Sequence, residues 1–263
     1  MGNMEFCLMN YLNTSTLASI TSGTTSVSKL YDRNNSLYWT SNGDNSDLTT
    51  TTIRIGFASS KNISRIILED INLKSFKIYY NSNTANLITL IGALTNASSW
   101  ASNSETSLYL KFATLSVNQI TIDMTATMIA NQEKQIGEFW ITDKYHVLEY
   151  QPDTSGFIPK FNRKQYAHEM SDGGSAVYIV QDNFKCSLKR DYVSSTEFTK
   201  FLGLYQLYDS FIFTPFPTGT AWVDENLKIY AVNWTNDFDF TKFIHNEKGL
   251  GYTGQMQLEE IAK

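Results

Sequence analysis

Apolar and polar residues alternate along much of the first half of the chain, which predicts β-strands. Strict alternation occurs in three segments, residues 51–57, 107–112 and 118–124. Such alternation places every second side chain on one face, as in a strand that is buried on one side. Residues 63–71 and 76–81 are instead rich in β-branched and aromatic residues, which is typical of central strands. Strands at this spacing, joined by polar loops without a helical pattern, predict an antiparallel sandwich.

The pattern changes near residue 147, where a segment containing Pro152, Gly156 and Pro159 predicts a linker. We therefore expect two domains, residues 1–146 and residues 147–263. A chain of 263 residues is long enough for both domains to bury a core.

One helix is predicted in the second domain, over about residues 195–209. Ser194 followed by Glu197 has the spacing of a capping box, in which the serine oxygen accepts from the backbone N–H three residues later. Apolar residues then recur at steps of three and four on one face, at Phe198, Phe201, Leu202, Tyr205 and Tyr208. The second domain is therefore predicted to be rich in β-strands with one α-helix.

Composition and charge exclude several classes of protein. Hydrophobic residues make up 42% of the chain, which is too apolar for disorder, and no stretch approaches the ~18 consecutive apolar residues of a membrane span. The net charge of −5 is spread over both halves, without the basic surplus expected of a nucleic-acid-binding protein. The first sixteen residues lack the pattern of a secretory signal peptide. Cys7 and Cys186 lie one in each predicted domain, so we expect buried free thiols and folding in a reducing compartment.

Motifs of known catalytic chemistry are missing from the sequence. There is no His-Glu-x-x-His, Gly-x-Ser-x-Gly, Walker loop or Cys-x-x-Cys, and His146, His168 and His245 are far apart in sequence. Residues 171–176, with two adjacent glycines, predict a hairpin turn rather than a phosphate cradle, because no helix follows them. We expect no catalytic residues and no enzymatic activity.

The order of elements in the first domain resembles the discoidin domain, the galactose-binding-like jelly roll also called the coagulation-factor C-type domain. The resemblance spans about residues 20–145, from "LYDRNNSLYWTS" to "KQIGEFWI". It rests on Leu30, Asp32, Trp39, Ser41, Ile63, Ile66, Gly137 and Glu138. The resemblance implies an antiparallel jelly-roll sandwich followed by the second, β-rich domain.

The same resemblance implies a structural calcium site at Asp32 and Glu138, because many discoidin domains bind calcium through matching carboxylates and backbone carbonyls. Hard oxygen ligands suit this ion. The sequence departs from the family at Arg33, where glycine is common, and a guanidinium beside Asp32 offers an alternative way to neutralise it.

Two tryptophans and a polar loop are candidates for ligand contact. In the family the aromatic residue matching Trp39 packs in the core, so we expect Trp39 to be structural rather than to grip a sugar. Asn42 and Asp44 lie in a loop on the expected ligand face. Trp100 stands among Ala, Ser and Asn, and it is either a sugar-stacking residue, an anchor of its loop or a residue buried against another subunit.

The second half resembles the small β-rich domain of tail-tip and minor tail proteins of long-tailed phages. The matching stretches are residues 198–217, 230–238 and 251–261. The resemblance implies a structural protein of a virion tail, made in the cytoplasm of a host bacterium, with other tail proteins as partners and a homo-oligomeric ring as its assembly. The alternative interpretation is a carbohydrate-binding module of a surface or secreted protein.

Overall fold

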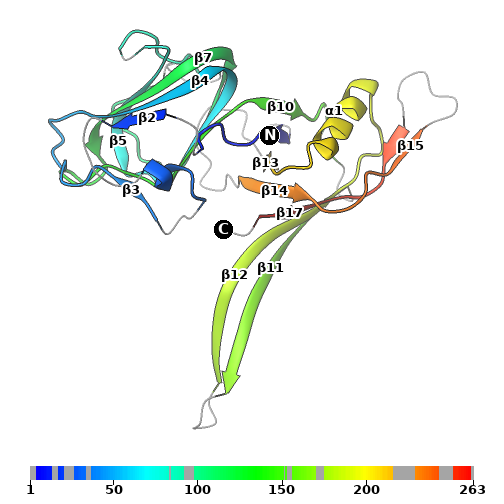
Figure 1. Ribbon diagram of the computed structural model, residues 1–263. Helices are drawn as coiled ribbons and strands as arrows, with labels where there is room; N and C mark the ends of the chain where they lie inside the picture. The colour runs from blue at the N-terminus through cyan, green and yellow to red at the C-terminus, as the bar shows by residue number, and fades with distance from the viewer. Residues whose placement is uncertain are drawn as a thin grey trace.

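The computed structural model describes residues 4–13, 17–20, 27–33, 37–82, 84–91, 98–150, 152, 156–169, 175–215, 229–242 and 251–261. Two lobes lie side by side, and a long β-hairpin extends away from both of them (Figure 1). The fold is mainly β, with antiparallel sheets and a single α-helix among the described residues, as predicted. No described helix is long and apolar enough to cross a membrane.

The first lobe is an antiparallel sandwich. Its six-stranded sheet contains β2 (Leu17–Ile20), β4 (Thr51–Glu69), β7 (Leu108–Thr127), β5 (Leu73–Tyr80) and β6 (Ser99–Trp100), with β9 (Glu138–Thr142) paired to β4. Two short strands, β3 (Trp39–Thr40) and β8 (Gln135–Ile136), pair beside it, and the 3-10 helix η1 (Val27–Leu30) packs nearby.

Strands β4 and β7 contribute to both layers of the sandwich. The pairing of β4 with β7 is interrupted between Gly56 and Lys61, and β4 is buried on either side of this irregularity but exposed within it. Because bulges bend strands, this break lets the ribbon turn from one layer into the other. The apolar alternation predicted from the sequence then points into one core, which includes Trp39 at 0% exposure. The prediction that Trp39 is structural is confirmed.

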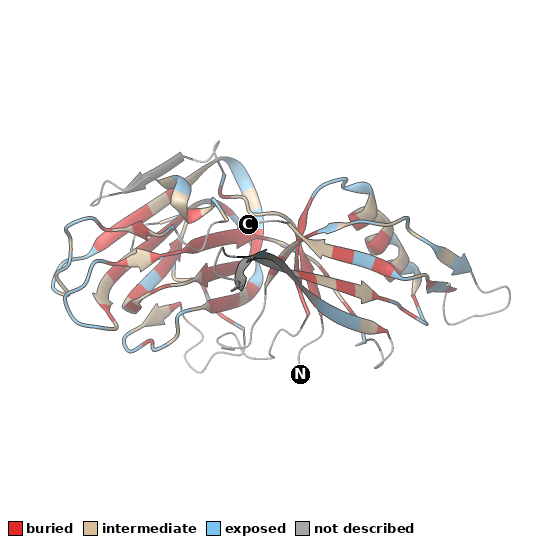
Figure 2. Ribbon diagram, turned by 90° about the horizontal axis from the view of Figure 1, so that it is seen from below, coloured by how far each residue is buried: buried red, intermediate tan, exposed pale blue. Residues whose placement is uncertain are grey.

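The second lobe is a seven-stranded sheet covered by the helix. Its order is β10 (Lys144–Val147), β1 (Glu5–Cys7), β13 (Phe211–Thr214), β14 (Tyr230–Trp234), β17 (Met256–Glu260), β12 (Ser175–Leu188) and β11 (Phe157–Glu169). A separate two-stranded sheet contains β15 (Phe240–Lys242) and β16 (Gly251–Thr253). Figure 2 shows that buried residues follow the strands of both lobes.

The predicted helix is confirmed as α1 (Ser195–Gln206). The Ser194 side chain accepts from the Glu197 backbone N–H at 3.2 Å, as the capping box requires. The helix buries Phe201 and Leu204 against the core of the lobe. The periodicity also places Tyr208 on this buried face, and that prediction is wrong: the helix ends at Gln206 and Tyr208 is 88% exposed.

The N-terminal strand joins the two lobes in a way that the sequence did not indicate. Strand β1 pairs with β10 and β13, so β1 and β10 belong to the seven-stranded sheet, although β1 and most of β10 precede residue 147. A small apolar cluster at the junction contains Cys7, Ile67, Tyr109, Trp140 and Ile212. The division into domains at residue 147 stays a prediction.

A buried ion pair crosses this junction. The Glu5 carboxylate accepts from Arg65 Nε at 2.9 Å and from the Tyr109 hydroxyl at 2.7 Å, and it lies 3.1 Å from Lys111 Nζ. Burial raises the pKa of Glu5, but the hydrogen bond and charge of Arg65 outweigh this effect and hold the pKa below its usual value. Both cysteines are buried free thiols, as predicted, and burial raises the pKa of Cys7 to about 12.

Candidate functional site

Asn42 and Asp44, predicted as ligand-binding residues, lie in a loop that is held together from within. Asn42 and Gly43 have backbone φ angles of 40° and 91°, which form a tight turn. The hydroxyls of Thr49 and Thr51 donate to the two carboxylate oxygens of Asp44. These bonds give Asp44 a structural role in its loop.

The loop closes around a buried lysine. The Lys134 side chain is 0% exposed, and its ammonium group donates to the backbone oxygen of Ser46 at 2.7 Å and lies 3.6 Å from Asp44 Oδ1. It also donates to the backbone oxygens of Asp44 and Thr49 at 3.4 and 3.5 Å. A buried charge needs such partners, so Lys134 and Asp44 depend on each other for their position.

Trp100 does not stand free in a polar loop. It belongs to β6 and lies opposite Phe76 of β5. The two rings stack with centroids 4.4 Å apart and an interplanar angle of 15°, and Trp100 packs at the margin of the sandwich core. Among the interpretations that the sequence left open, this geometry favours an anchor of the loop.

The structure places Asp32 on the surface, immediately after η1, and buries Glu138 at 1% exposure at the start of β9. Residues 34–36, which complete the motif around Asp32, lie outside the described residues. Arg33 has a left-handed backbone with a φ of 61° and lines a small hollow at the lobe junction with Glu69 and Glu260. The described part of the chain contains no group of three or more potential His, Cys, Asp or Glu ligands. Calcium binding by Asp32 and Glu138 stays a prediction.

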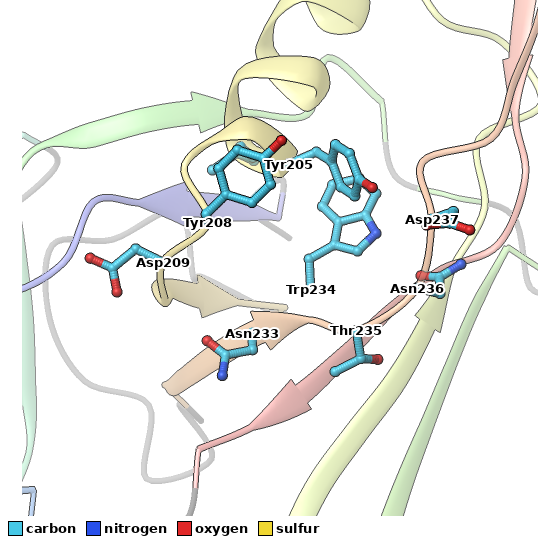
Figure 3. Close-up of a pocket in the computed structure, with 9 residues that line it drawn as sticks. Tyr205, Tyr208, Asp209, Asn233, Trp234, Thr235, Asn236 and Asp237 are labelled. Carbon is cyan, nitrogen blue, oxygen red and sulfur yellow. The ribbon is translucent and has the colours of Figure 1, made fainter.

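A hollow lies in the second lobe, where α1 ends beside β14. Its volume is about 740 Å³, and it is open to solvent. Figure 3 shows Tyr205 and Tyr208 above Trp234, with polar side chains around them. Tyr205 meets Trp234 edge-on, with ring centroids 5.6 Å apart. The polar residues that line the hollow are Asp209, Asn233, Thr235, Asn236 and Asp237.

The sequence contains one signal for this hollow. Trp234 stands in the polar run Asn233–Asp237, and a tryptophan in such a run has no periodic reason to be in a core. Periodicity instead places Tyr205 and Tyr208 on the apolar face of the helix, because it does not locate the end of the helix.

The hairpin of β11 and β12 contributes Phe184, Cys186 and Leu188 to the core of the second lobe at its base and then extends away from it. The strands pair with each other from Phe157 and Leu188 at the base to Glu169 and Ser175 near the tip. The predicted turn at residues 171–176 falls mostly outside the described residues. Strand β11 is the edge strand of the sheet, and β12 pairs with β17 only from Lys185 to Leu188 among the described residues.

A buried acid–base cluster fixes the start of α1. Glu197 lies 3.4 Å from Arg190 and 3.8 Å from His146 Nε2, and it accepts from the Glu149 backbone N–H at 3.3 Å. Burial raises the pKa of Glu197, but the neighbouring His146 and the charge of Arg190 bring the pKa below its usual value. The cluster ties α1 to the loop that follows β10 and to the end of β12.

Comparison with known proteins found no matching family model and no matching curated protein. Among solved structures, the chitosan-binding module 1 of a chitosanase/glucanase from Paenibacillus sp. IK-5 is 16% identical over 48% of this chain and 94% of that chain, with a TM-score of 0.38. CpGH89CBM32-5 of Clostridium perfringens, solved with GalNAc-β-1,3-galactose, is 12% identical over 48% of this chain and 94% of that chain, with a TM-score of 0.37. A putative α-L-fucosidase from Bacteroides thetaiotaomicron is 13% identical over 51% of this chain and 28% of that chain, with a TM-score of 0.41. These values concern about half of the chain and carry no information about its ligand.

Proposed function

We propose that the protein is a non-enzymatic structural subunit of a phage tail or a tail-like particle, and that its β-hairpin docks on a neighbouring subunit. The observation that carries this proposal is the hairpin itself, which extends away from both lobes (Figure 1). With 14 residues in β12 at ~3.3 Å each, the strand is roughly 46 Å long.

An isolated two-stranded ribbon is at best marginally stable in water. Among the described residues, a third strand pairs with the hairpin at its base alone, through the pairing of β12 with β17. The strand segment beyond the base contains Val177–Val180, a run of four apolar residues in the sequence. A surface supplied by another molecule would stabilise the ribbon beyond its base.

A second copy of the chain is the partner that this arrangement favours. An arm that leaves one subunit and binds a different surface of the next is a heterologous contact, and repeated contacts of this kind close into a ring when the rotation allows. The ring would surround a tail tube or tip together with other tail proteins, and the sandwich lobe would project from it.

The test is a shortened hairpin. Residues 163–182 are replaced by Asn-Gly, so that Asn162 and Asn183, which pair in the hairpin, flank a two-residue turn. Particles purified from cells that make the protein are then examined for the variant by electron microscopy and by chemical cross-linking. Leu48→Ser, at a side chain that is 95% exposed on the sandwich lobe, is the control for surface change.

We expect the wild type and Leu48→Ser to be incorporated as a ring, and the shortened protein to fold with an unchanged melting temperature but to stay out of particles. Normal incorporation of the shortened protein would contradict the proposed role of the hairpin. A wild type found only as a free monomer would contradict assembly altogether.

A second candidate function is carbohydrate binding by the sandwich lobe. The observation that favours it is the partial exposure of Trp100 on the edge strand β6. Glycan binding that is lost in Trp100→Ala, in a variant that still folds, would support this function.

A further inference from the structure

Tyr208 has a strained backbone conformation and an exposed side chain. Its φ of 50° lies in the left-handed region, where a bulky side chain is rare, and it follows the last turn of α1 at a position that glycine usually occupies. Its side chain is nevertheless 88% exposed, so burial of the ring does not offset the backbone strain. Backbone strain that persists at an exposed aromatic residue often marks a binding surface.

The ring of Tyr208 belongs to a group of three aromatic side chains around the hollow (Figure 3). Its centroid lies 6.4 Å from that of Tyr205, which in turn meets Trp234. Trp234 is fixed from behind by an edge-on contact with Phe238 at 5.5 Å. The hollow is therefore lined by aromatic side chains of two elements, the end of α1 and β14, and Phe238 packs against one of them, Trp234.

The polar side chains of the hollow divide into supporting groups and open groups. Asn236 donates to Gln255 O at 2.6 Å and accepts from Gln257 N at 2.7 Å, so it holds the turn after β14. Asn233 and Asp237 are exposed, and neither side chain makes a hydrogen bond to the described part of the chain. Asp209 receives the Ser210 backbone N–H on one oxygen at 2.7 Å. Amide and carboxylate groups thus remain available beside the rings.

The negative charge of the hollow favours neutral or cationic ligands over anionic ones. Two aspartates line it, and no lysine or arginine is among the described lining residues. An anionic ligand would be repelled, whereas hydroxyl groups can donate to the carboxylates and an ammonium group can also lie over an aromatic face. Flat apolar C–H faces together with many hydroxyls are the combination that a pyranose sugar offers.

We propose that this hollow binds a carbohydrate, namely a neutral or amine-bearing oligosaccharide, with a sugar ring stacked on Tyr208 and Trp234 and its polar groups bonded to Asp209, Asn233 and Asp237. The site lies in the second lobe and does not depend on the hairpin. It would give an assembled subunit a contact with a polysaccharide surface.

The experiment is a glycan array followed by titration of the best glycans with the full chain, monitored by tryptophan fluorescence. The array contains neutral oligosaccharides, amine-bearing chito-oligosaccharides and sialylated or sulfated glycans. Tyr208→Gly removes the ring and relieves the left-handed strain, so the variant is expected to fold at least as well as the wild type. Tyr150→Ala, at a side chain that is 67% exposed away from the hollow, is the matched control.

We expect neutral or amine-bearing glycans to bind, with an affinity reduced at least tenfold in Tyr208→Gly and changed less than twofold in Tyr150→Ala. Asp237→Asn should weaken the amine-bearing glycans more than the neutral ones. Binding of anionic glycans alone, no binding at millimolar concentrations, or equal binding by Tyr208→Gly would overturn the proposal. Loss of binding in Trp100→Ala but not in Tyr208→Gly would place the sugar in the sandwich lobe instead and would also overturn it.

Discussion

The substitution Glu5→Gln tests how firmly the two lobes are joined. Glu5 and Arg65 meet across the junction with side chains that are only 4% and 7% exposed. The glutamine keeps the shape of the side chain but leaves the guanidinium of Arg65 without its buried counter-charge. Removing one partner of a buried ion pair typically costs about 3–5 kcal/mol of unfolding free energy.

This cost is measurable by urea unfolding and by thermal melts followed by circular dichroism. A chain of this size loses about 2–4 °C of melting temperature per kcal/mol, so we expect a decrease of roughly 6–20 °C. The variant Arg65→Met in the Glu5→Gln background removes the orphaned charge, and it should recover part of the loss, as a double-mutant cycle reveals. A Glu5→Gln protein within 1 kcal/mol of the wild type would refute the reasoning.

The same pair predicts a dependence of stability on pH. The pKa of Glu5 is lower in the folded protein than its ordinary value of 4.5, so the folded state binds its proton less readily than the unfolded state. Its contribution to stability is therefore complete above the unfolded pKa and is lost as the pH falls through the folded pKa. The acid loss of stability should be smaller in Glu5→Gln.

Three further predictions concern the sandwich lobe. Trp39→Ala should lower the unfolding free energy by about 3–5 kcal/mol in urea titrations, because it leaves a cavity at a fully buried site. Trp100→Ala should lower it by only about 1–2 kcal/mol, through the lost stacking on Phe76. Equal losses in the two variants would contradict this difference in burial. Lys134→Met should lower the unfolding free energy by about 3 kcal/mol in the same assay, because it leaves buried carbonyl oxygens and a carboxylate without their donor. An unchanged urea midpoint would show that the loop does not depend on the ammonium group. Calcium held by Asp32 and Glu138 would bind only the native state, so EDTA should lower the melting temperature and added calcium should restore it; a melting temperature that does not respond to EDTA would show that the two carboxylates hold no structural ion.

Local pattern was sufficient for much of the secondary structure. Alternating residues such as Ile53 and Ile55 predicted strands, and Ser194 with Glu197 predicted the start of the helix, because these signals depend on neighbours only two to four positions away. The burial of Trp39 followed from a family resemblance that has the same element order. Composition alone indicated a folded, globular protein.

Tertiary structure alone decided how the two lobes meet and where candidate sites lie. Strand β1 is only three residues long and has no periodic signal, yet its pairing with β10 brings Glu5 to Arg65 and joins the lobes. Asp44 and Trp100 lie in polar segments of the sequence. The local pattern does not predict that Asp44 pairs with Lys134 or that Trp100 stacks on Phe76. The physical reason is the same in each case: a sequence pattern shows which side of an element is apolar, whereas the chain topology decides which distant residue covers that side.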